Sequence, residues 1–194
     1  MRHSTVARFA ALALAALGLI CAAQPAAAAG VRASLNYAFV GDYIGTGALA
    51  NAVTSHFAYT DGVNFTEGTG ANQATTLYEA RRTIAASSNE TLDLHGVLTD
   101  DFGQTVNFVS IKAIVVKASA ANTNNVVIGA AGSNPFTGPF GGTTPTISVP
   151  PGGRIVLTAP AAGWTVVDSS SDQLKVANSS SGSGVTYDIL LIGN

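Results

Sequence analysis

Along residues 30–194 the hydrophobic positions form short runs of β-branched and aromatic residues, and clusters of Gly, Asn, Ser and Pro separate these runs. Such runs between turn residues are typical of β-strands. The strongest run covers residues 106–118 and predicts a central strand, since its Ile and Val residues favour a strand over the amphipathic helix that residues 109–118 could also form. Further strands are predicted at residues 76–86, 91–98, 126–128, 147–149, 155–158, 164–167, 174–177 and 185–192.

The first part of this pattern is weaker. Leu35, Tyr37 and Phe39 alternate with smaller residues and predict a strand over residues 31–40, and the glycines that follow predict a loop over residues 41–51. Residues 55–60 predict a short strand that ends in the turn dipeptide Asp61-Gly62. A hairpin is therefore expected around that dipeptide.

About ten strands and no helix make the chain all-β. The expected architecture is an antiparallel two-sheet β-sandwich, jelly-roll-like, that forms one domain over residues 30–194. The pattern leaves the order of the strands open.

Residues 1–29 have the order of a secretory signal peptide. Arg2 and Arg8 precede an apolar run over residues 9–23, and small residues follow up to Ala29. The apolar run is shorter than the ~20 residues that span a bilayer, so we expect cleavage and no membrane anchor afterwards. The expected location is the periplasm, the cell surface or the medium. Cys21, the single cysteine, lies in this segment, so the domain would depend on its core and not on disulfides.

The composition argues against a nucleic-acid, catalytic, metal or cofactor site. Charged residues make up 10% of the chain, against about 25% in ordinary soluble domains. Without a basic patch, nucleic-acid binding is not expected. His56 and His95 are the only histidines after residue 29, and Asp100 with Asp101 lies beside Gly103, as is typical of a turn. No catalytic, metal or cofactor site is predicted.

The least regular stretch, residues 129–145, mixes Gly and Pro with Phe136 and Phe140. Loops of this length are often functional, so the stretch predicts a contact surface, with Asn134, Phe136, Phe140 and Trp164 as candidate binding residues. In the alternative, the two Phe rings cover the core and Trp164 belongs to it.

Several short sequence segments occur in an order that resembles the order in small bacteriophage and prophage proteins associated with the virion. They are GTGANQA at residues 68–74, ETLDLHGVLTDDFG at 90–103, IKAIVVKAS at 111–119, NTNNVVIGAAGSN at 122–134, PPGG at 150–153 and DQLKVANSSSGSGVTYDILLIG at 172–193. The resemblance implies a β-sandwich without enzymatic activity that serves assembly, decoration or attachment. It also implies a virion location if residues 1–29 are not a working signal.

The expected function is therefore a structural or interaction protein that associates with itself or with another surface protein or glycan. The alternative is a secreted carbohydrate-binding module that stacks sugars on exposed aromatic residues, for which Tyr43 and Tyr59 are candidates beside the loop residues.

Overall fold

The computed structural model describes residues 30–47 and 52–194, and these ranges contain strands, turns and no helix. The chain is therefore all-β, as predicted. The expected signal peptide at residues 1–29 lies outside the described residues. In the described part, no helix has the length and hydrophobicity needed to cross a membrane.

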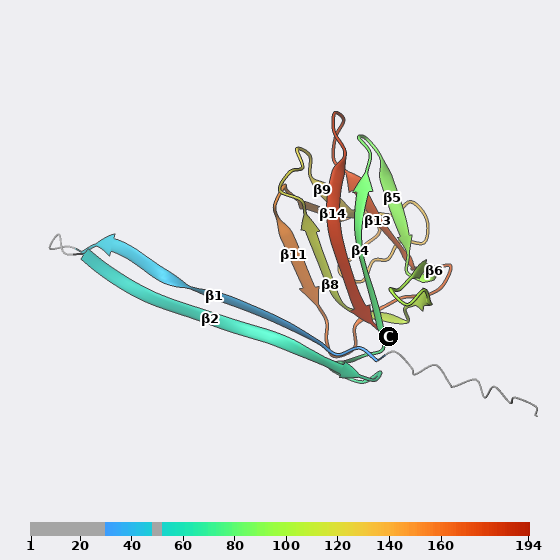
Figure 1. Ribbon diagram of the computed structural model, residues 1–194, viewed down its shortest axis with the longest axis horizontal. Helices are drawn as coiled ribbons and strands as arrows, with labels where there is room; N and C mark the ends of the chain where they lie inside the picture. Colours follow the sequence, from blue (N-terminus) through green and yellow to red (C-terminus); the bar gives the residue numbers. More distant parts are fainter. Residues whose placement is uncertain (1–29, 48–51) are drawn as a thin grey trace, which may run out of the picture.

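The body of the molecule consists of two antiparallel sheets and a small hairpin (Figure 1). The first sheet has the order β11 (Arg154–Thr158), β8 (Ser110–Ala118), β14 (Val185–Gly193) and β4 (Thr76–Ile84), and β12 (Trp164–Thr165) also pairs with β8. The second has the order β10 (Thr146–Val149), β9 (Val126–Gly129), β13 (Gln173–Asn178) and β5 (Asn89–Asp93). The hairpin consists of β6 (His95–Thr99) and β7 (Thr105–Asn107).

Side chains from both sheets share one hydrophobic core. In β14 every second residue from Val185 to Leu191 is buried, and β13 buries Leu174 and Val176 in the same alternating way. Ile114 and Val116 of β8 complete the middle of the cluster. These strands have the period of two that indicates one inward face.

The predicted central strand is confirmed, because β8 lies between β11 and β14. It is shorter than the predicted segment: β7 ends at Asn107 and β8 begins at Ser110, with the fully buried Phe108 between them. The predicted strand at residues 91–98 is likewise divided into β5 and β6 at Leu94, which is buried and donates its N–H to the carbonyl of Asp172.

Two long strands, β1 (Ala33–Thr46) and β2 (Ala52–Glu67), form an antiparallel ribbon that extends away from the body (Figure 1). The predicted loop is wrong at residues 41–46, which belong to β1. Gly41 is opposite Phe57, and a Cβ at position 41 would lie 2.9 Å from the tip of the Phe57 ring. A glycine in this strand thus makes room for a large side chain across the ribbon.

The turn predicted at Asp61-Gly62 is also wrong, since both residues lie inside β2. Asp61 is opposite Tyr37 and Gly62 is opposite Asn36. Asp61 accepts a hydrogen bond of 2.8 Å from the Tyr37 hydroxyl. The cross-strand partner therefore decides the conformation of a dipeptide that by itself favours a turn.

Only the base of the ribbon is packed against the body. There β2 pairs in parallel with the short strand β3 (Gln73–Ala74). A second hydrophobic cluster joins Phe65, which is 2% exposed, to Ala113 of β8 and Ile192 of β14. The ribbon thus begins on the face of the first sheet that points away from the main core.

Lys112 fixes the connection between the ribbon and the body. It lies in β8, is 1% exposed, and its Nζ donates hydrogen bonds to the backbone carbonyls of Thr69, Gly70 and Gln73. The first two carbonyls belong to the segment that leads from β2 to β3, and the third belongs to the first residue of β3. Burial lowers the pKa of Lys112, because removal from water disfavours the charged ammonium. The hydrogen bonds to the three carbonyls offset this cost.

Replacing Lys112 with Met keeps most of the volume and removes the donors. We expect Lys112→Met to lower the free energy of unfolding by about 2–3 kcal/mol, because the carbonyls lose a charged partner. Urea unfolding checks this. Lys117→Met, on an exposed position of the same strand, is the control and should change stability by less than about 0.5 kcal/mol. A Lys112→Met protein as stable as the control would contradict the role given to Lys112.

Candidate interaction surface

The β1–β2 ribbon has two chemically different faces. In an antiparallel pair, directly opposite residues project to the same side, and successive residues alternate between sides. One side, the aromatic face, carries Leu35, Tyr37, Phe39, Tyr43, Val53, Phe57, Tyr59, Asp61 and Val63. The other, the polar face, carries Ser34, Asn36, Asp42, Thr54, His56, Thr60 and Asn64, with Val40 and Ile44 among them. The ribbon is therefore amphipathic.

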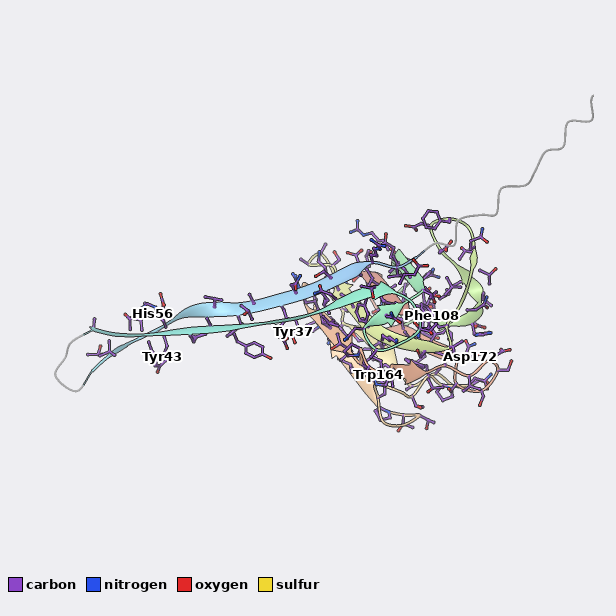
Figure 2. The ribbon with its side chains drawn as sticks, turned by 90° about the horizontal axis from the view of Figure 1, so that it is seen from below. Tyr37, Tyr43, His56, Phe108, Trp164 and Asp172 are labelled. Carbon is purple, nitrogen blue, oxygen red and sulfur yellow. The ribbon has the colours of Figure 1, made fainter. Side chains whose placement is uncertain are left out.

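The rings of the aromatic face lie against each other and are open to solvent. Phe39 stacks on Phe57 with ring centroids 5.5 Å apart, and the centroids of Tyr37 and Tyr59 are 6.3 Å apart. Phe39 is 72% exposed and Tyr43 is 74% exposed. Figure 2 shows Tyr37 and Tyr43 on one side of the ribbon and His56 on the other. The rings contact their neighbours within the ribbon, but among the described residues no second layer covers them.

Among the paired residues of β1 and β2, Asp61 is the one charged residue on the aromatic face. Its carboxylate accepts hydrogen bonds from the hydroxyls of Tyr37 and Tyr59 and from the backbone N–H of Gly62. The hydrogen bond to Asp61 raises the pKa of Tyr37 to about 12. The same hydrogen bond, followed by that from Gly62, lowers the pKa of Asp61. Asp61 is therefore a fixed negative charge among aromatic rings.

The polar face has its own cross-strand partners. His56 and Asp42 are directly opposite and form an ion pair when the imidazole is protonated, and the Ser34 hydroxyl donates to Asn64 at 2.7 Å. These groups are suited to water. The same contrast is found in antiparallel sheets that have one solvated face and one face packed against other residues.

An isolated two-stranded ribbon is at best marginally stable in water. A contiguous apolar surface outside the core marks a site of interaction with another molecule. Both considerations point to the aromatic face as the candidate interaction surface of this protein.

The four binding residues predicted from the sequence lie elsewhere. Phe136 is 2% exposed and belongs to the main core, and Phe140 and Trp164 are partly buried against it. The carbonyl of Asn134 accepts the N–H groups of Asp172 and Gln173, which ties the loop to β13. This placement favours the alternative in which the aromatic residues of the loop cover the core.

Trp164 and the loop are nevertheless brought together. A Cβ at Gly138 would collide with the Cβ of Trp164, so the loop backbone packs directly on this side chain. The glycines and prolines of residues 129–145 therefore shape a loop that folds back on the body. Of the aromatic face, the sequence indicated only Tyr43 and Tyr59 as candidates, and the alternation of Leu35, Tyr37 and Phe39 was the signal for the rest.

The described residues contain no group of three or more His, Cys, Asp and Glu that could hold a metal ion. His95 contacts the carbonyl of Phe108 at 3.0 Å through Nδ1. Asp100 Oδ1 accepts the N–H groups of Phe102 and Gln104, which confirms the turn predicted there.

No protein-family model matches the chain, and a search among curated proteins finds no match either. The resemblance to phage proteins thus stays a prediction.

Phe136 in the core and Phe39 on the ribbon should contribute differently to the free energy of unfolding. Phe136→Ala should lower the free energy of unfolding by about 3–5 kcal/mol, because it removes a fully packed ring from the core. Phe39→Ala is the matched change on the ribbon and should cost under about 1 kcal/mol, since it loses mainly one ring stack. Chemical denaturation of both variants measures the difference. Equal costs would contradict the assignment of Phe136 to the core.

Proposed function

We propose that this protein is a non-catalytic structural or interaction protein that assembles with itself or attaches to a surface through the β1–β2 ribbon. The observation that carries the proposal is the aromatic face, a row of exposed rings on a strand pair outside the core. In this function the body serves as a rigid base and the ribbon as an arm.

We infer further that the body is a two-sheet, jelly-roll-like sandwich. The nested order of its antiparallel pairs supports this. The first and last strands, β4 and β14, pair with each other, and so do β5 with β13, β8 with β11 and β9 with β10. From the outermost pair, β4 with β14, to the innermost, β9 with β10, successive pairs belong alternately to the first and second sheet. A long hairpin rolled up in this way is the jelly-roll arrangement.

The sequence supports a location outside the cytoplasm. A signal peptide at residues 1–29 would deliver the domain to the periplasm, the cell surface or the medium. The resemblance to phage proteins supports a virion instead, if that segment is not a signal. In both places a charge-poor surface favours close packing against other copies or other surface proteins.

A carbohydrate-binding module is the second candidate, and the aromatic face is the observation that favours it. Tyr43 and Tyr59 are exposed there, and sugar rings stack on such side chains. In this function the ribbon binds glycan polymers while the protein itself remains a monomer.

Deleting residues 37–61 tests the arm. The deletion joins Asn36 to Gly62, which are opposite each other in the ribbon, and Asn-Gly is a favoured dipeptide for a two-residue hairpin turn. The anchoring cluster around Phe65 remains intact. We expect a folded protein that has lost its association with itself or with its natural surface, as measured by sedimentation and by circular dichroism.

The outcomes separate the candidates. Unchanged association after the deletion would contradict the proposed function. Binding of the undeleted, monomeric protein to polysaccharides, lost on deletion, would favour the carbohydrate-binding module. Tyr59→Ser is a finer variant for the same assays, because it removes one exposed ring and leaves the ribbon paired.

A further inference from the structure

The outer face of the first sheet, on the side away from the main core, carries two adjacent rows of side chains. In the cationic row, the cross-strand neighbours are Arg154, Lys117, Asp188 and Arg81. In the apolar row, two positions away along each strand, the cross-strand neighbours are Val156, Val115 and Leu190. Glu79, opposite Leu190, ends this row. A shallow groove runs along Val115, Leu190 and Lys117.

The cationic row has an excess of positive charge, because Arg81, Lys117 and Arg154 outnumber its one carboxylate, Asp188. Arg81 Nε donates to Asp188 Oδ1 at 2.6 Å, which pairs the one carboxylate of the row. Lys117 and Arg154 are directly opposite each other, and no ion pair of either is present among the described residues. Like charges in opposite positions are unfavourable. A carboxylate supplied from outside would therefore be stabilised between Lys117 and Arg154.

The ribbon has the complementary charge. Residues 33–67 contain Asp42, Asp61 and Glu67, and no Lys or Arg. Of the three, only Asp61 lies among the exposed rings of the aromatic face. If another molecule covers that face, the Asp61 carboxylate is removed from water and requires a cation. A wholly apolar partner surface would leave it unpaired.

The spacing of the two surfaces also agrees. On the aromatic face, the pair Tyr37 and Asp61 is two residues from the pair Phe39 and Tyr59. The cationic and apolar rows are likewise two residues apart, which is about 7 Å along a strand. A ribbon that runs along β8 can thus place Asp61 at the cationic row while Phe39 and Tyr59 cover Val115 and Val156, which lie outside the cluster at the base of the ribbon.

The base of the ribbon already makes this type of contact within one molecule. Val63 and Phe65, on the aromatic face, pack in a cluster with Ala113, Leu190 and Ile192 of the outer sheet face. Beyond this base the ribbon extends away from the body (Figure 1). A ribbon from another molecule could continue the layer that the base begins.

We propose that the ribbon of one copy lies on the outer sheet face of a second copy, with Asp61 between Lys117 and Arg154 and the Phe39 and Tyr59 rings on Val115 and Val156. This inference rests on the proposed function, and names the partner as a second copy of the chain. The ribbon and the sheet face are different surfaces, so each copy can give one ribbon and receive another. Such contacts close into a ring, of which a reciprocal dimer is the smallest, or extend into a filament.

Charge reversal tests the contact. Asp61→Lys in one preparation of the full chain, and Lys117→Glu with Arg154→Glu in another, should each weaken self-association roughly tenfold or more, because each places like charges together. Analytical ultracentrifugation measures the loss. All three changes in one chain should restore the assembly, since the ribbon and the sheet face are then complementary again with their charges exchanged.

Mixing the two preparations gives a second, independent rescue. The ribbon of the Asp61→Lys variant fits the reversed sheet face, and the unchanged ribbon of the other variant fits the unchanged face. Both contacts of a head-to-tail assembly are then matched, so the mixture should assemble with the two variants alternating. Neither preparation alone should do so at the same concentration.

Asp42→Lys is the matched control, since it changes an acidic residue on the polar face of the same ribbon and should leave association unchanged. Circular dichroism confirms that each variant is folded. Self-association that survives both reversals, while deletion of residues 37–61 abolishes it, would overturn the docking inference and leave the proposed function standing. A wild-type chain that stays monomeric, or a mixture of the two variants that does not assemble, would also overturn it.

Discussion

A two-stranded ribbon has no second layer to cover its apolar side chains, and the proposed function of this protein depends on that constraint. The sheets of the body bury their inward side chains in one core, whereas the β1–β2 ribbon pairs its backbone and leaves its aromatic face in water. Apolar surface of this kind is stabilised by removal from water. The body can complete its own core, but the ribbon needs another surface to cover its rings.

The contacts at the ribbon's base decide how such an arm can work. Lys112 binds the carbonyls of the segment after β2, and the cluster around Phe65 holds the first part of the ribbon on the sheet. The arm is therefore anchored on β8, a central strand of the body. A flexible linker in the same place would cost more conformational entropy on binding.

Much of the body could be predicted from the sequence, because strands such as residues 185–192 have a clear period of two and end at turn residues. The ribbon could be predicted only in part, as strands over residues 31–40 and 55–60. Gly41, Gly45 and the dipeptide Asp61-Gly62 favour loops locally and are held in strands by their cross-strand partners. The burial of Phe136 could not be predicted for a related reason. Composition indicates that Phe136 lies in a long loop, but only the three-dimensional packing shows that its ring is in the core.

The most direct test of the account is hydroxyl-radical footprinting of the natural protein in its assembled state. Phe39 and Tyr43 are compared with Phe102, which is 76% exposed on the turn between β6 and β7 and has no part in the contact. If another molecule covers the aromatic face, Phe39 and Tyr43 should be strongly protected and Phe102 should be fully labelled. Labelling of all three in proportion to their exposure would contradict the claim that another molecule covers the aromatic face.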